Sequence, residues 1–362
     1  MPQQPPCPYF GRCGGCALQN STYEEQLDQK QAVIDQLFPD AQRIIGSKNQ
    51  FFYRNRMDYA FGPDFSLGLR DKNRGVINIE RCLLMSESSN ELFAQLRGYA
   101  RDKGLAAYRS GIMRHAVLRE AKNLKSTVFN ILTSSEGELP LLDLWERFSH
   151  RVQGVVWSIN LSPADRSYGD IKQVCGQDYY EEELAGLRFK IPVQSFFQTN
   201  IVGAEQIIAT VKEFLEPAAT DKIYDLYSGT GSIGLSLANQ VKAVVGIEEN
   251  EPATRLSLDN AALNKINNYS VLVGRAENVL KTHDLQADKV VVDPPRPGIH
   301  RRVLQKLGEA GPRTIVYVAC NPQTQKNDVG ILAEYGYKIS RCQPIDMFPQ
   351  TPHIENILQL QK

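Results

Sequence analysis

The sequence predicts an α/β protein whose C-terminal half forms a doubly wound, mostly parallel sheet, preceded by two smaller parts. Residues 191–362 repeatedly place a helical segment after a short apolar strand, as in "KIYDLYSGTGSIGLSLANQ". Strands and helices that alternate in this way build parallel sheets with helices on both faces. Residues 86–190 mix helices with neighbouring strands, which predicts a smaller α+β domain. The length of 362 residues suits two or three domains.

The composition is typical of a soluble globular protein, with 42% hydrophobic and 23% charged residues. No apolar run approaches the roughly 20 residues of a membrane span. The start, "MPQQPPCPYF", has neither the basic nor the apolar region of a signal peptide. We therefore expect a cytoplasmic monomer with no membrane partner. In a reducing compartment its 7 cysteines need metal, catalytic or packing roles rather than disulfides.

The N-terminal part, residues 1–85, carries one amphipathic helix and four notable cysteines. Leu27, Ile34 and Phe38 fall at helical spacing in "TYEEQLDQKQAVIDQLF". The stretch "CPYFGRCGGC" brings three thiols onto one tight loop, and a strand segment supplies a fourth. These are Cys7, Cys13, Cys16 and Cys82. Four thiolates hold zinc or a [4Fe-4S] cluster, and their spacing alone slightly favours zinc in a protein that binds nucleic acid.

The basic residues cluster, although the total charge is balanced at 41 basic and 41 acidic residues. Residues 97–125 contain 8 basic and 2 acidic residues, and a second basic group in residues 43–74 is interleaved with aromatics. The aromatics are Phe51, Phe52, Tyr53 and Tyr59. Cations mixed with flat side chains suit an RNA surface, where phosphates and unstacked bases need partners. A merely solvated face is the alternative.

Residues that follow the first two strands of the parallel sheet predict a cofactor that contains adenosine. The turn "DLYSGTGSIG" contains Gly229 and allows close approach of the backbone to a ligand. Glu248 ends the next strand, where a carboxylate can hold ribose hydroxyls. Asp225 precedes the glycines and opposes a phosphate, which disfavours a nicotinamide dinucleotide. A cationic cofactor such as S-adenosylmethionine suits the turn better.

Asp293 and Cys320 end the next two strands. In "VVVDPPRPG" the prolines make a stiff loop that holds Asp293. Methyltransferases of exocyclic nitrogens also use an acid or amide before Pro-Pro, so this motif does not discriminate. In "TIVYVACNPQT" Cys320 stands on the ligand-binding edge. A free cysteine is most often a small buried hydrophobe, as we expect for Cys175 and Cys342.

A thiol at that edge can also act as a nucleophile. The C5 carbon of uracil is too weakly nucleophilic to attack a sulfonium methyl group directly. Addition of a thiolate to C6 makes C5 reactive, and a base must then remove the C5 proton.

Five motifs in this order resemble the RNA uracil-C5 methyltransferases, which use S-adenosylmethionine and have a Rossmann-like catalytic domain. They are "SFFQTN", "DLYSGTGSIG", "DPPRPG", "VACNPQT" and "DMFPQTPHIE". The resemblance implies that Cys320 is the nucleophile, that Glu355 is the base and that Gln198 lies by cofactor and substrate. It also implies cofactor contacts at Tyr227, Gly229, Glu248 and Asp293. Ser232 departs from the family, which often has Asn there, so one cofactor contact stays open.

The cysteines resemble those of a branch of this family that carries a [4Fe-4S] cluster. The resemblance favours that cluster over zinc on Cys7, Cys13, Cys16 and Cys82, in a structural role. It also favours 23S rRNA as substrate, with a tRNA uridine as the alternative. The chain begins at the cysteine motif, so we expect a compact enzyme without an additional N-terminal β-barrel.

The resulting division is an iron-sulfur region in residues 1–85, an RNA-binding domain in 86–190 and the methyltransferase domain in 191–362. A base N-methyltransferase using Asp293-Pro-Pro, a dinucleotide enzyme and a non-catalytic RNA-binding module stay as alternatives. Without its motif, Glu355 would be interpreted as a plain surface carboxylate.

Overall fold

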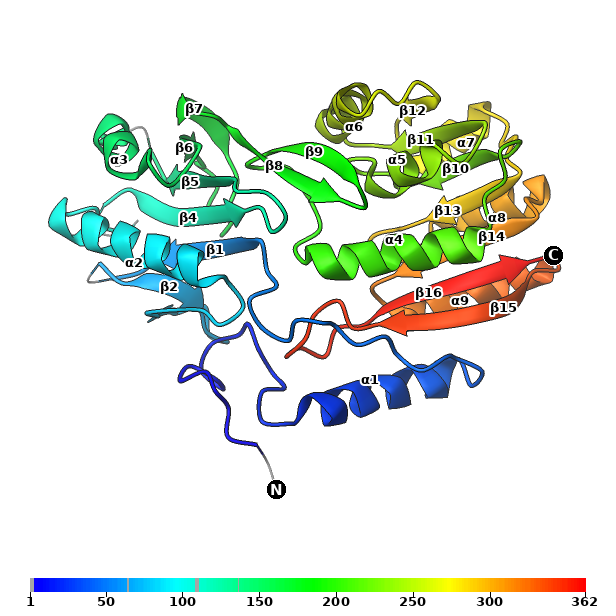
Figure 1. Cartoon of the computed structure of the whole chain (residues 1–362), viewed down its shortest axis with the longest axis horizontal. Helices are drawn as coiled ribbons and strands as arrows, with labels where there is room; N and C mark the ends of the chain where they lie inside the picture. The colour runs from blue at the N-terminus through cyan, green and yellow to red at the C-terminus, as the bar shows by residue number, and fades with distance from the viewer. Residues whose placement is uncertain (1–2, 64, 108–110, 136) are drawn as a thin grey trace.

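Two seven-stranded sheets stand side by side in the computed structural model, which describes residues 3–63, 65–107, 111–135 and 137–362. The first sheet holds β1 to β7 and the second holds β10 to β16, and the hairpin of β8 and β9 joins them (Figure 1). No helix in these ranges is long and apolar enough to cross a membrane.

The first sheet has the strand order β3-β2-β1-β4-β5-β6-β7. Its strands are β1 (Arg56–Phe61), β2 (Leu67–Arg70), β3 (Val76–Asn78), β4 (Met113–Glu120), β5 (Thr127–Thr133), β6 (Gly154–Ile159) and β7 (Asp170–Gly176). Strands β5 and β6 pair in parallel, and the other neighbouring strands of this sheet pair antiparallel. The helices α2 (Glu87–Asp102) and α3 (Leu141–Phe148) pack on one shared core, where Phe93 and Phe148 are fully buried. Strands from both sides of residue 85 share this sheet, and the division at 85 and 190 stays a prediction about folding units.

The second sheet has the order β12-β11-β10-β13-β14-β16-β15. Its strands are β10 (Lys222–Leu226), β11 (Ala243–Glu248), β12 (Tyr269–Val273), β13 (Lys289–Val292), β14 (Thr314–Ala319), β15 (Lys338–Ile345) and β16 (Glu355–Gln361). The strands β10 to β14 run parallel, while β16 pairs antiparallel with both β14 and β15. The predicted doubly wound, mostly parallel sheet is confirmed.

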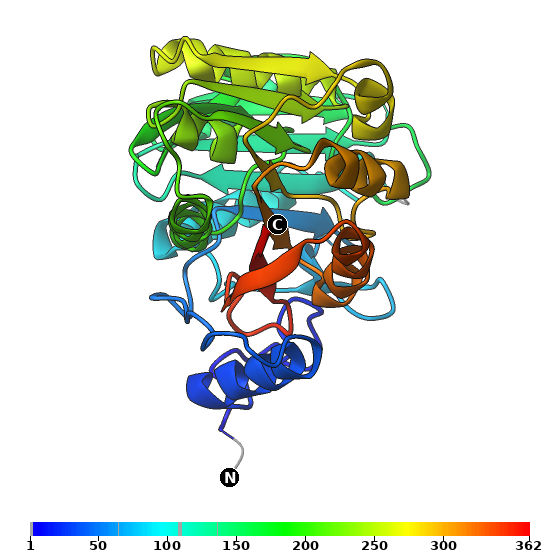
Figure 2. The ribbon, with the colours of Figure 1, turned by 90° about the vertical axis from the view of Figure 1, so that its right-hand side faces the viewer.

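Helices cover both faces of this second sheet. One core contains residues of α4 (Ile201–Leu215), α5 (Ser232–Ala238) and α6 (Glu251–Leu263). The other contains residues of α7 (Ala276–Thr282), α8 (Arg301–Ala310) and α9 (Pro322–Glu334). In Figure 2 the green α4 and the orange helices lie on opposite sides of the red strands.

The helix α1 (Tyr23–Leu37) lies beneath the second sheet, far from the strands that follow it in sequence (Figure 1). It begins with a capping box: Thr22 Oγ1 accepts from Glu25 N, and Glu25 Oε2 accepts from Thr22 N. Ile34 and Phe38 are buried in the core that α7, α8 and α9 also share. The amphipathic pattern predicted this helix correctly. The hairpin strands β8 (Tyr179–Leu184) and β9 (Leu187–Pro192) complete the fold.

Candidate active site

A cleft of about 1320 Å³ opens at the carboxyl ends of the central strands of the second sheet, where ligands of such sheets bind. Its lining includes all seven residues that the sequence predicted for catalysis and cofactor binding. They are Gln198, Tyr227, Gly229, Glu248, Asp293, Cys320 and Glu355. They come from six segments of the chain, and all but Gln198 lie at or near the end of a strand of the second sheet.

The glycine turn after β10 forms one wall of the cleft. Gly229 and Gly231 have φ angles of 53° and 82°, and Tyr227 has 62°, a left-handed backbone that is costly for a residue with a side chain. Glu248 Oε2 accepts a hydrogen bond from Gly229 N at 2.9 Å, so the end of β11 is tied to the turn. A carboxylate so placed is suited to ribose hydroxyls.

Asp225 lies beneath this turn rather than in the cleft, which corrects our sequence argument. Its Oδ2 accepts from Gly234 N at 3.0 Å, and the side chain is buried. Burial, with Asp293 and Glu248 nearby, raises the pKa of Asp225 to about 8. Asp225 is therefore mostly neutral at neutral pH and presents no charge to a ligand. The acids that line the cleft include Glu248, Asp293 and Glu355.

Cys320 and Glu355 lie near each other at one end of two paired strands. In the antiparallel register of β14 and β16, Ala319 pairs with Asn356. Cys320 directly follows Ala319 and Glu355 directly precedes Asn356, and the two side chains are close enough that the carboxyl of Glu355 raises the pKa of the Cys320 thiol. Both residues are partly exposed in the cleft. Thus the insertion of β16 beside β14 brings the predicted nucleophile to the predicted base.

The turn after Cys320 is fixed by the start of α9. Asn321 caps the helix, with Oδ1 accepting from Gln323 N at 3.2 Å, and Pro322 occupies the first helical position. Burial raises the pKa of the Cys320 thiol, and so do the carboxyls of Glu355 and Asp293, while Arg296 lowers it. Arg296 is therefore the cation that favours the thiolate.

Burial and the nearby Asp293 raise the pKa of Glu355 to about 8, and burial raises that of Asp293 to about 7. At neutral pH Glu355 is thus mostly a neutral acid. A neutral partner does not repel a thiolate at Cys320, whereas proton abstraction requires the carboxylate.

Among the cleft residues that our sequence analysis did not name as site candidates are Arg296, Phe348 and Phe196. Phe196 lies beside Gln198 and is 70% exposed, which is unusual for a phenylalanine. An exposed aromatic ring at the mouth of a cleft suits stacking on an unpaired base. All three residues stand in motifs that we quoted, but a motif does not say which side chain points outward.

The four N-terminal cysteines line a second cavity, of about 600 Å³, which shares Phe196 and Phe197 with the active-site cleft. Burial is the main cause that raises the pKa of Cys16 to about 12 and of Cys82 to about 11, and neighbouring cysteines add to both shifts. The thiols of these four cysteines therefore lie near one another. Yet no group of three or more His, Cys, Asp or Glu side chains in the described ranges has an arrangement that could hold a metal ion. The predicted iron-sulfur region thus gains no support from the arrangement of these side chains.

Cys175 and Cys342 are buried in cores, as predicted.

Much of the basic and aromatic surface predicted to face RNA is engaged within the protein. Arg56 pairs with Asp58 and Arg70 with Asp165, each at 2.7 Å from Nε to a carboxylate oxygen. Arg43, Arg97, Arg114, Arg119 and Lys122 also bond to acidic side chains or backbone carbonyls. Tyr53 and Tyr59 are buried in the core. Arg109 lies outside the described residues. These contacts leave a smaller RNA-facing surface than the sequence suggested.

Comparison with known proteins agrees with this architecture. A crystal structure of the Pyrococcus abyssi tRNA (uracil-54, C5)-methyltransferase in complex with S-adenosyl-L-homocysteine superimposes with a TM-score of 0.85 at 31% identity, covering 97% of this chain and 86% of that one. The fold and the cleft thus define a Rossmann-like methyltransferase.

Sequence comparison specifies the family. The tRNA (uracil-5-)-methyltransferase family matches residues 22–362, and the chain belongs to this family. It is 36% identical to the tRNA (uracil(54)-C(5))-methyltransferase of Pyrococcus furiosus, over 98% of this chain and 85% of that protein. It is 37% identical to an uncharacterized RNA methyltransferase of Clostridium tetani, over 98% of this chain and 83% of that protein.

Proposed function

We propose that this protein transfers a methyl group from S-adenosylmethionine to C5 of a uridine in tRNA. The observation that carries the chemistry is the pair of Cys320 and Glu355 in one cleft. The Pyrococcus relatives, whose names specify uridine 54 of tRNA, favour tRNA over the 23S rRNA that the cysteine pattern led us to expect. A uridine in 23S rRNA stays the second candidate.

The cleft suits an adenosine cofactor that carries a cation. Glu248 at the end of β11 would hold the ribose hydroxyls, while Tyr227 and the turn at Gly229 would cover the adenosine. Asp293 would face the cationic end. When bound, S-adenosylmethionine supplies an electrophilic methyl group on a sulfonium.

The roles that we propose for the two facing residues follow from their chemistry. The Cys320 thiolate adds to C6 of the uracil, which forms a C–S bond and moves electron density to C5. C5 then takes the methyl group, and S-adenosylhomocysteine is the leaving product. Glu355 removes the C5 proton as a carboxylate. The C–S bond breaks, the C5–C6 double bond re-forms and the thiolate is released.

The test is methylation of defined RNAs with labelled S-adenosylmethionine. We expect 5-methyluridine in tRNA transcripts, none with Cys320→Ala, and a covalent protein–RNA adduct with RNA that contains 5-fluorouridine. Label on 23S rRNA alone would overturn the choice of tRNA. Methylation that persists in Cys320→Ala, or methyl groups found on base nitrogens, would overturn the mechanism in favour of an N-methyltransferase that uses Asp293-Pro-Pro.

We further propose that Cys7, Cys13, Cys16 and Cys82 are metal ligands, with the [4Fe-4S] cluster as our first choice. All four line one cavity, and a bound cation would relieve the raised pKa values of Cys16 and Cys82. Such a group would brace the N-terminal loop. Iron, sulfide and zinc analysis of anaerobically purified protein tests this, with Cys16→Ser as the comparison. Protein that contains neither iron nor zinc would overturn it.

A further inference from the structure

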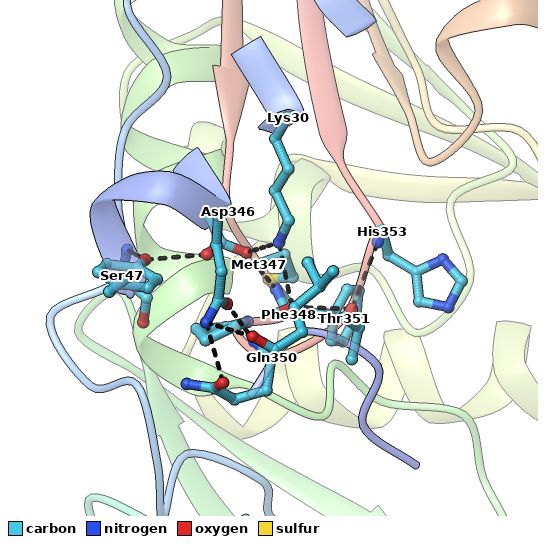
Figure 3. Close-up of polar contacts among 12 residues, drawn as sticks. Lys30, Ser47, Asp346, Met347, Phe348, Gln350, Thr351 and His353 are labelled. Carbon is cyan, nitrogen blue, oxygen red and sulfur yellow. Dashed lines mark hydrogen bonds and ion pairs between the residues drawn. The ribbon is translucent and has the colours of Figure 1, made fainter. Parts of the chain in front are cut away.

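The loop between β15 and β16 closes one side of the catalytic cleft. It spans residues 346–354 and leads directly into Glu355, and its Phe348 lines the cleft together with Cys320. Residues from the first 53 positions of the chain hold this loop through the contacts drawn in part in Figure 3. The opposite end of the chain thus supports the segment that carries the proposed base.

A buried ion pair forms the centre of these contacts. Lys30 Nζ on α1 lies 2.6 Å from Asp346 Oδ1, and the two side chains are only 2% and 0% exposed. Lys30 Nζ also donates to the carbonyl oxygen of Phe348 at 3.2 Å, and Asp346 Oδ1 accepts from Phe348 N at 3.2 Å. Both members of the pair therefore bond to the backbone of the residue that lines the cleft (Figure 3).

Other contacts from the N-terminal segment complete the support. Tyr23 OH donates to Asp346 Oδ2 at 2.9 Å, so a second side chain of α1 binds the same carboxylate. Gln26 exchanges two hydrogen bonds with Gln350: Gln350 N donates to Gln26 Oε1, and Gln26 Nε2 donates to Gln350 Oε1, each at 3.0 Å. Tyr53 OH donates to the carbonyl oxygen of Pro349 at 3.0 Å.

The loop needs this support because its own backbone is strained. Gln350 has a φ of 71°, in the left-handed region that a residue with a Cβ rarely adopts. Such a conformation persists only where the surroundings over-determine it. Here Ala17 N and Leu18 N both donate to the carbonyl oxygen of Gln350, at 2.8 and 3.1 Å. Ala17 directly follows Cys16, so the end of the cysteine loop also contacts the turn at Gln350.

A buried ion pair contributes little to the net stability of a protein, because the cost of desolvating the two charges offsets much of their attraction. It does specify geometry, since each charge accepts few substitute partners. We propose that Lys30, through Asp346, is a positioning residue that keeps Phe348 and Glu355 facing Cys320. The inference rests on the proposed function, because the step that it affects is proton removal by Glu355.

The experiment separates methyl transfer from release of the RNA. We would compare Lys30→Met and Lys30→Met/Asp346→Asn with the unaltered enzyme, using labelled S-adenosylmethionine and tRNA. Lys30→Met leaves a buried unpaired carboxylate and can unfold the protein, whereas the double variant removes both charges at similar volume. In the double variant we expect methyl transfer in the first turnover close to the unaltered rate. Release should be slowed about tenfold or more, because misplacing a reacting group by ~1 Å can cost about a hundredfold.

The readout is the fraction of methylated RNA still covalently bound to protein on a denaturing gel. Lys306→Met is the matched control, since Lys306 forms an exposed ion pair with Glu309 of the same helix, α8, and lies outside both basic groups. It should release RNA at the unaltered rate. An adduct fraction in the double variant equal to that of Lys306→Met, or equal slowing of transfer and release, would overturn the inference alone. Failure of the unaltered enzyme to transfer any methyl group would overturn the proposed function, and the inference with it.

Discussion

At the residue scale, the two proposed reacting groups need opposite protonation states at different moments. Cys320 must be a thiolate to add to the base, and a neutral Glu355 beside it lowers the electrostatic cost of that charge. Glu355 must later be a carboxylate to remove a proton. Its pKa of about 8 allows both forms near neutral pH, and Asp293 and burial are the causes.

Replacing the proposed base should separate the two halves of the reaction. In Glu355→Gln we expect methyl transfer to continue and release to slow by about a hundredfold to ten-thousandfold, the usual contribution of a positioned base. The enzyme should therefore accumulate bound to methylated RNA, which a denaturing gel detects. Rapid free turnover by this variant would remove Glu355 from the role of base.

The pH dependence of release should follow the same group. Because a base acts when deprotonated, the release rate should rise with pH and level off above about 8, the pKa raised by burial and Asp293. Quenched-flow measurement of adduct decay across this range gives the profile. A rate that falls with rising pH would contradict the assignment, and Glu355→Gln should lose the dependence.

Arg296 should govern the first step instead. Its charge lowers the pKa of Cys320, so Arg296→Gln should raise that pKa and slow adduct formation at neutral pH by about tenfold for each unit of increase. Higher pH should restore the rate. The measurement is the pH profile of adduct formation with RNA containing 5-fluorouridine. An unchanged profile would mean that Arg296 acts elsewhere.

At the element scale, the helix α1 connects the N-terminal segment to the second sheet by packing against its helices. Its capping box satisfies backbone donors that the first turn leaves free, and its buried face joins the core of α7, α8 and α9. A local change at the start of this helix should therefore affect the stability of the protein.

The cap itself gives the test. Thr22→Ala removes the hydroxyl that accepts from Glu25 N, and it should lower the free energy of unfolding by about 1 kcal/mol. Urea unfolding measures the loss, and Thr22→Ser, which keeps the hydroxyl, should retain most of the stability. Equal stability of the Ala and Ser variants would show that the cap contributes nothing here.

At the scale of the whole molecule, three acids of the cofactor and catalytic region are shifted together. The pKa values of Asp225 and Glu355 are raised to about 8 and that of Asp293 to about 7, chiefly by burial. An acid whose pKa is raised on folding favours the folded state while it is protonated. That contribution is fully present below its unfolded pKa and is lost as pH rises through the folded value.

We therefore expect the melting temperature without cofactor to fall between about pH 4 and about pH 8, where the folded protein holds more protons than the unfolded chain, and to level off above about pH 8. In Asp293→Asn the fall should be smaller, because one of the three acids no longer titrates. Calorimetry over this pH range measures both proteins. A melting temperature that rises across the range would contradict the assignment of these shifts.

Patterns among neighbouring residues of the sequence were enough to predict the fold of the second sheet and several residues of the cleft. Alternating apolar strands and helices predicted the doubly wound sheet, because the period of burial and the glycine turns are written in neighbouring residues. Residues just after the strands lie in one cleft, since the carboxyl ends of parallel strands share an edge. This is why Gly229, Glu248, Asp293 and Cys320 could be found as candidates from the strand pattern, whereas Gln198 and Tyr227 were implied only by the family resemblance.

Long-range packing decided the remainder. The antiparallel pairing of β16 with β14 brings Cys320 near Glu355, and no neighbouring residues encode that proximity. Burial of Asp225 beneath its turn and of Tyr59 in a core depends on elements that close over them. The contact between Lys30 and Asp346 spans 316 positions of sequence. Local periodicity specifies which face of an element is apolar, but only the folded chain determines what that face meets.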